Sequence, residues 1–187
     1  MESALDRKTL WNEGARAGLI FGAIAIAYMV INSFTGKLGA DGSPLLAGLI
    51  SVLNLALWAG KFLGCIFLMR GLMRKLCEAN PDALNGDTFL FGVITALLSA
   101  LLYSAFYLAF VLFIQPDMLT NAYDTVLSSY SSMLDSNTME QMENLRGSLP
   151  QMTFFTNLFW CVLYGTVLSA ILSRNIPSRN PFAKEDD

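Results

Sequence analysis

Histidine is absent from this chain, charged residues make up only 14% of it, and cysteine occurs three times. The lack of histidine removes the commonest metal ligand and the commonest general base of enzymes. Cys65, Cys77 and Cys161 have neither the spacing of a zinc site nor that of an exported disulfide framework. The G-x-S-x-G, P-loop and glycine-rich dinucleotide motifs are also missing. We therefore expect no metal, no cofactor and no catalytic residue.

The sequence contains four long apolar stretches, at residues 17–34, 45–69, 88–114 and 152–173. A bilayer core is about 30 Å thick, so a spanning helix needs about 20 mostly apolar residues. Each stretch reaches or approaches that length. The sequence predicts an all-α membrane protein in which residues 1–187 form a single domain of four transmembrane helices. The lipid bilayer is its expected partner, and the net charge of −3 argues against nucleic acid.

The positions of lysine and arginine predict the orientation of these helices. Nine of them lie before the first stretch, between the second and third, or after the fourth, whereas only Lys37 and Arg146 lie in the other two connections. Cytosolic loops are enriched in these residues, so we expect both termini in the cytosol. The leader before the first stretch is mixed in charge, and the stretch is long for a signal-peptide core. We therefore expect an uncleaved first span.

Residues 117–149 form the only sizeable segment expected outside the bilayer. Their apolar residues recur at steps of four and three, which is one stripe of a helix. This stripe consists of Leu119, Tyr123, Val126, Tyr130 and Met133. Asn137 with Glu140 resembles the capping box of a second helix, and Gly147 suits its end. We predict an extracytoplasmic amphipathic helical hairpin, which either serves as a lid or docking surface or covers its own bundle and the headgroup layer.

Small residues at four-residue steps predict where the helices touch, because lipid gives helices no hydrophobic reason to pair and close backbone approach matters instead. The first helix has Gly14, Gly18 and Gly22, the second Ala56, Gly60 and Gly64, the third Ala96 and Ala100, and the fourth Gly165 and Ser169. We interpret the two three-membered ladders as the packing faces of the first and second helices, within this chain or in a homo-oligomer.

Lys61 is the one charged residue well inside an apolar stretch. A lysine near the bilayer centre costs about 2.5–3.5 kcal/mol on insertion, so such a residue is a functional candidate. Asn54 and Gly64 share its helical face, which predicts a polar seam turned to the bundle interior. No stretch contains an acid, so the candidate partners are uncharged: Tyr28, Asn32, Tyr103, Tyr107, Asn157 and Tyr164. Lys61 either binds an anionic headgroup or substrate or is hydrogen-bonded within the bundle.

The order of these features is similar to that of a known family. The third stretch opens with FLFG (89–92) and is followed by IQPD (114–117), the acidic segment contains MEQME (139–143), and Pro150 and Gly165 mark the last span. The chain thus resembles the domain-of-unknown-function (DUF) 4199 family of Bacteroidetes membrane proteins. The resemblance implies a bacterial inner membrane and assigns no activity.

The leading functional interpretation is a non-enzymatic membrane protein that interacts with or supports other envelope components, such as another membrane protein. The alternative is a small transporter or channel subunit that uses the polar seam at Asn54 and Lys61. A membrane enzyme is the third interpretation, and the residue inventory favours it least.

Overall fold

The computed structural model describes residues 5–40, 43–130, 133 and 135–176, and these residues form helices without any strand. Four of the helices are long and apolar enough to cross a membrane. They are α1 (Arg7–Ala40), α2 (Pro44–Ala79), α3 (Asn85–Ala109) and α6 (Leu149–Ser173). The all-α class and the four apolar stretches are therefore confirmed. The basic residues Arg179 and Lys184, which entered the orientation argument, lie outside the described residues.

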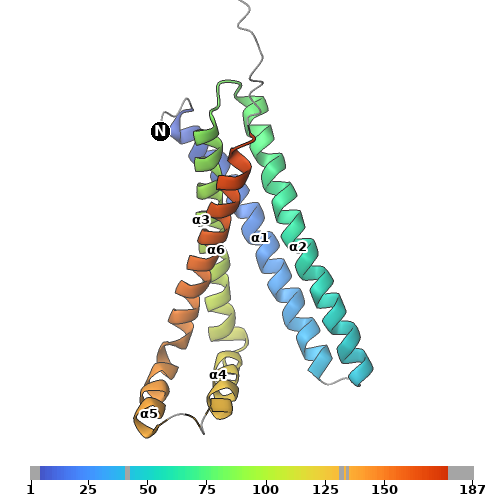
Figure 1. The fold of residues 1–187 in the computed structure, drawn as a ribbon, viewed down its shortest axis with the longest axis vertical. Coiled ribbons are helices and arrows are strands. Elements are labelled where there is room, and N and C mark those ends of the chain that lie inside the picture. The colour runs from blue at the N-terminus through green and yellow to red at the C-terminus, as the bar shows by residue number, and fades with distance from the viewer. Residues whose placement is uncertain (1–4, 41–42, 131–132, 134, 177–187) are drawn as a thin grey trace, which may run out of the picture.

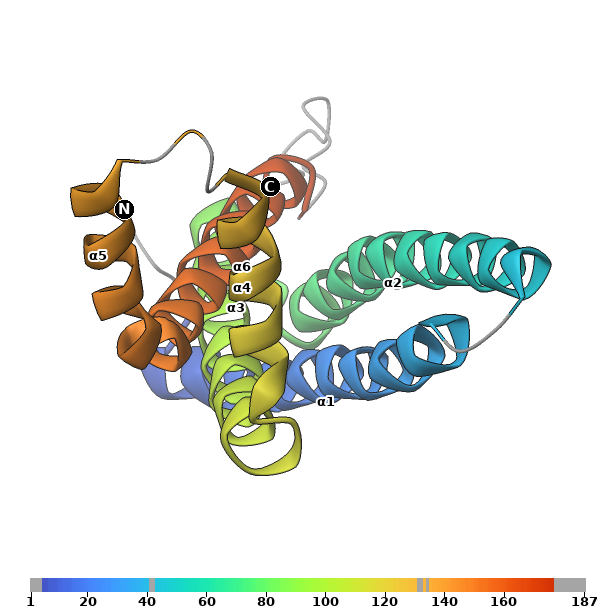
Figure 2. The ribbon, with the colours of Figure 1, turned by 90° about the horizontal axis from the view of Figure 1, so that it is seen from below.

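The four long helices converge at one end of the molecule and diverge toward the other (Figures 1 and 2). α3 packs most extensively against α6 and α1, whereas α2 contacts mainly α1. The larger buried cluster lies where the helices converge and includes Leu10, Met73 and Phe91. A smaller cluster of Met29, Phe110 and Val111 lies further along α1 and α3. The bundle is therefore tightest at the converging end.

Both ends of the third span are set by local chemistry. At its start, the backbone N–H of Leu84 donates to Asp87 Oδ2 at 2.9 Å, and Thr88 Oγ1 donates to the carbonyl of Ile176 at 2.8 Å. The second bond ties the beginning of α3 to the residues that follow α6. At its other end, α3 continues into a π-helical turn, Phe110–Ile114, which stops just before Pro116. Proline lacks the amide hydrogen that a longer helix would need there.

The glycine ladder of α1 packs against α3. A Cβ atom at Gly14 would lie 2.7 Å from Ile94 Cγ2, and one at Gly18 would lie 2.8 Å from Leu98 Cβ. Gly22 meets Leu102 in the same way, and Gly165 of α6 meets Ala96 of α3. These glycines allow the close helix contact that membrane bundles rely on. The sequence interpretation named this ladder as a packing face of the first helix without naming its neighbour, and in the structure that neighbour is the third helix.

The segment between α3 and α6 contains two short helices, α4 (Asp117–Tyr130) and α5 (Ser136–Leu145). The cap of α5 is Asp135, whose Oδ1 accepts from the Thr138 N–H at 2.9 Å, so the capping box predicted at Asn137 is wrong by two residues. The predicted stop at Gly147 is a 3₁₀ turn, Arg146–Ser148, that leads directly into α6.

Side-chain contacts hold the two short helices together. Tyr123 O–H of α4 donates to the Met142 carbonyl of α5 at 2.6 Å, and Arg146 pairs with Asp124. In the predicted apolar stripe, Leu119 packs on the smaller cluster and Tyr123 is half-buried. Val126 and Tyr130, further along α4, and Met133, beyond its end, are exposed.

Candidate functional site

Lys61 of α2 lies half-buried among the long helices, with its ammonium group against aromatic rings. Its Nζ is 4.5 Å from the ring centroid of Tyr28 on α1 and 6.0 Å from that of Tyr103 on α3. A cation within about 6 Å of a ring face is attracted by the negative face of the π-system. Two of the tyrosines named as candidate partners are therefore the groups that meet Lys61.

A cavity of about 360 Å³ opens beside Lys61 and is lined by all four long helices. Trp58 and Phe62 of α2 stack at 5.7 Å between ring centroids, and Phe62 lies at the same distance from Tyr164 of α6. Thr95 and Ser99 of α3 add hydroxyls to the lining. Their hydrogens already bond to carbonyls of their own helix, Phe91 and Ala96 respectively. The cavity is thus mostly aromatic and apolar, with one cation on its wall.

No carboxylate is among the described residues that line this cavity. The ion pairs found in the described part of the chain, Arg16–Glu13 and Arg146–Asp124, lie elsewhere. The described residues also hold no group of three acidic, histidine or cysteine side chains suited to a metal ion. The arrangement suits an apolar molecule with one anionic or strongly accepting group, because only such a group would complement Lys61.

Asn54 is part of the same helix face but outside the cavity. Its Oδ1 accepts from Thr35 Oγ1 of α1 at 2.8 Å. The Asn54–Thr35 and Lys61–Tyr28 contacts are separated by seven residues on both helices, as expected for antiparallel neighbours. Gly64, the third proposed member of the seam, instead faces open space.

The remaining candidate partners of Lys61 have other surroundings. Tyr107 lies 6.2 Å from Tyr103 between ring centroids, and the carbonyl of Asn32 accepts from Thr35 Oγ1 at 3.1 Å. Asn157 is half-buried on α6 and does not line the cavity. The polar seam is therefore a contact line between α1 and α2 that reaches the cavity only at Lys61.

The glycines of the second ladder have no neighbour in the described part of the chain. A Cβ atom at Gly60 or Gly64 would meet nothing within 4 Å, and the same holds for Gly48 and Gly71 of α2. Only Met69, Met73 and Leu76 of this 36-residue helix are buried. The assignment of Gly60 and Gly64 to helix packing stays a prediction that requires another molecule.

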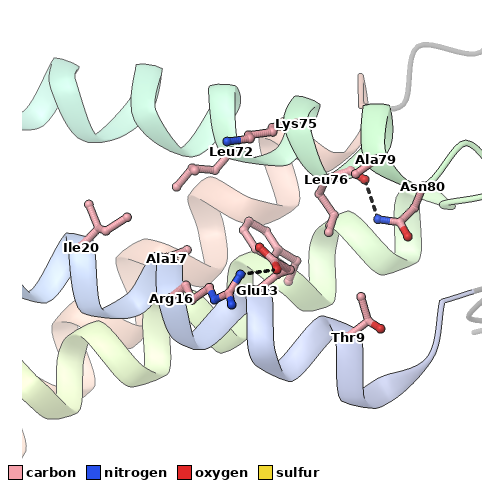
Figure 3. Close-up of a pocket in the computed structure, with 11 residues that line it drawn as sticks. Thr9, Glu13, Arg16, Ala17, Ile20, Leu72, Lys75, Leu76, Ala79 and Asn80 are labelled. Atoms are coloured by element: carbon pink, nitrogen blue, oxygen red, sulfur yellow. Dashed lines mark hydrogen bonds and ion pairs between the residues drawn. The ribbon is translucent and has the colours of Figure 1, made fainter.

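A second pocket, of about 460 Å³, lies between the beginning of α1 and the end of α2 (Figure 3). Its charged residues are Glu13 and Arg16 from α1 and Lys75 from α2. Arg16 Nη1 donates to Glu13 Oε1 at 3.2 Å. Sequence reasoning used Arg16 and Lys75 only as markers of orientation. The signal that could have joined them is the antiparallel alignment of the two helices.

Comparison with known proteins adds one finding. Residues 16–174 match the model of a family described as "Protein of unknown function (DUF4199)". The match begins in α1 and ends just after α6, so it includes all four long helices and the segment between α3 and α6. No curated protein and no solved structure matches the chain significantly.

Proposed function

Because the chain belongs to the DUF4199 family, as the sequence resemblance predicted, and that family has no assigned function, we propose a function from the geometry. The protein is a non-enzymatic multi-pass protein of the bacterial inner membrane. It interacts with another envelope membrane protein through the outer face of α2, the face that carries Ala56, Gly60 and Gly64.

The observation that carries this proposal is the contrast between the glycines of different helices. Side chains of α3 occupy the space beside Gly14, Gly18 and Gly22. In contrast, a Cβ atom at Gly60 or Gly64 would meet no atom of the described residues within 4 Å. Lipid can cover any apolar face, but small residues at four-residue steps favour the close approach of another helix. The proposed binding partner of this face of α2 is therefore a transmembrane helix of another protein.

The non-enzymatic role rests on the residue inventory. The chain has no histidine, and its one intramembrane cation meets tyrosine rings rather than an acid–base partner. General acid–base and nucleophilic catalysis both need a positioned proton acceptor.

The proposed orientation rests on the charges at the two ends of the bundle. The converging end carries the basic residues Arg7, Lys8, Arg16, Arg70, Arg74, Lys75 and Arg174. Acidic residues dominate α4 and α5 at the other end, where Arg146 is paired with Asp124. The positive-inside rule then assigns the converging end and both termini to the cytosol, and the α4–α5 hairpin to the extracytoplasmic side.

Photo-crosslinking in native membranes tests the partner helix. A photoreactive residue at Gly60 should give one discrete adduct, and Gly64→Leu should abolish it. Leu55 is the matched control, because it is exposed and lies on the other side of α2. An adduct of two 20.5 kDa chains would identify the partner as a second copy. Equal crosslinking at both positions, or none at Gly60, would refute the proposed face.

A second candidate function, a small transporter or channel subunit, is favoured by the cavity beside Lys61. Transport requires an aqueous route to that cavity. In a variant without native cysteines, Trp58→Cys and Phe62→Cys should then react with a charged, water-soluble thiol reagent, whereas Leu55→Cys should not. Failure of both cavity positions to react would eliminate this candidate and leave the first.

A further inference from the structure

The pocket between the beginning of α1 and the end of α2 combines two kinds of surface (Figure 3). Its polar side carries two cations, Arg16 and Lys75, and one carboxylate, Glu13, with Thr9 and Asn80 also in the lining. Its apolar side is formed by Ala17, Ile20, Leu72, Leu76, Ala79 and Phe91. A molecule that fills it must itself have an anionic part and an apolar part.

The cations of this pocket are accessible to a ligand. Arg16 is paired with Glu13, but their side chains are 77% and 44% exposed, and such a surface ion pair contributes little to stability. Lys75 is exposed, and among the described residues no carboxylate oxygen lies within 4.0 Å of its ammonium group. A phosphate oxygen could therefore bind Lys75 directly and share Arg16 with Glu13.

The depth of the pocket fits a lipid headgroup. It lies at the end of the bundle where the basic residues gather, and its apolar wall continues along the spans through Ile20, which is 46% exposed. Anionic headgroups of the cytosolic leaflet occupy this depth, and basic pockets between helices there bind them. Free phosphate would satisfy the cations but would leave the apolar wall uncovered.

We infer that this pocket binds an anionic glycerophospholipid of the cytosolic leaflet. Its phosphate interacts with Arg16 and Lys75, and an acyl chain lies along Ile20 and Leu72. The inference goes beyond the proposed function, because none of the open glycines of α2 lines this pocket. Lipid binding in this pocket depends on the proposed membrane orientation but not on the partner helix at α2. Each of these two proposals can therefore be refuted without the other.

Titration of the full-length protein in neutral detergent tests the inference, with the thermal midpoint as readout. Phosphatidylglycerol in mixed micelles should raise the midpoint saturably, whereas phosphatidylcholine at the same concentration should not. Inorganic phosphate at the same concentration distinguishes the two sources of phosphate, and it should give no comparable shift. An equal shift with phosphatidylcholine or with inorganic phosphate would overturn the inference.

Substitutions then locate the site. Arg16→Gln and Lys75→Gln should each weaken phosphatidylglycerol binding about tenfold, because each removes a direct charged hydrogen bond to the phosphate. Glu13→Gln should strengthen binding, because it releases Arg16 from its ion pair. Stronger binding by Glu13→Gln would show that Arg16 contacts the lipid. If Arg16 had only a structural role, loss of its ion pair with Glu13 would not strengthen lipid binding.

Arg74→Gln is the matched control, since Arg74 is an exposed cation next to Lys75 that does not line the pocket. It should leave the affinity unchanged. Equal weakening by Arg74→Gln and Lys75→Gln would mean that the lipid responds to overall charge, and would overturn the site.

Discussion

Replacement of Gly18 by leucine should destabilise the isolated chain, whereas replacement of Gly60 by leucine should leave its stability almost unchanged. A Cβ atom at Gly18 would lie 2.8 Å from Leu98 Cβ and 3.2 Å from the carbonyl oxygen of Thr95. The latter is backbone, which cannot move without shifting α3. Overpacking of this kind costs about 1–3 kcal/mol. A Cβ atom at Gly60 would meet no atom of the described residues within 4 Å, so a leucine there creates no comparable clash at its Cβ.

Thermal unfolding of the purified protein in one detergent measures this contrast. For a chain of this size 1 kcal/mol corresponds to about 2–4 °C, so Gly18→Leu should lower the midpoint by about 2–12 °C. Gly60→Leu should leave the midpoint within about 2 °C of the parent, as expected for a surface substitution. Gly18→Ala is the intermediate control, because it adds only the Cβ atom. An unchanged midpoint for Gly18→Leu, or an equal fall for Gly60→Leu, would refute the assignment of the two glycine faces.

Two further predictions concern Lys61 and the start of α5. Lys61→Met should preserve expression and thermal stability, since it removes a cation that costs about 2.5–3.5 kcal/mol in the membrane; a fall in either would show that Lys61 is needed for folding. Hydrogen bonds from the side chain and backbone of Thr138 hold the pKa of Asp135 below its usual value of 3.8. The contribution of the Asp135 carboxylate to stability is therefore present above pH 3.8 and lost as the pH falls through the lowered pKa. Hydrogen-exchange protection of the Thr138 amide should decrease over that pH range in the parent protein. It should not decrease in Asp135→Asn. Equal pH dependence in both proteins would contradict the cap.

The spans could be predicted from the sequence because length and apolarity alone decide whether a helix can cross a bilayer. The neighbours of each span could not. Gly14, Gly18 and Gly22 mark a face of α1, but a repeat of small residues does not say which helix fills it. The side chains that pack against these glycines belong to Ile94, Leu98 and Leu102, and nothing in the sequence distinguishes them from other apolar residues.

The candidate sites show the same division between local and long-range information. Lys61 was identifiable because a charge in an apolar stretch is rare. Its tyrosine contacts depend on how α1, α2 and α3 align. The same holds for the pocket in Figure 3, which Arg16 of α1 and Lys75 of α2 line together. The α5 cap was missed because Asp135 and Asn137 are both favourable cap residues, and only the observed hydrogen bond to Thr138 decides between them.

The most direct test of the whole account is cysteine accessibility in intact spheroplasts, in a variant without Cys65, Cys77 and Cys161. A cysteine at Asn121 of α4 should react with a membrane-impermeant reagent added outside, a cysteine at Asp82 should react only after permeabilisation, and a cysteine at Val52 should react in neither case. Reaction of Asn121 and Asp82 from the same side, or of Val52 with the charged reagent, would contradict a bundle that spans the membrane with its basic end in the cytosol.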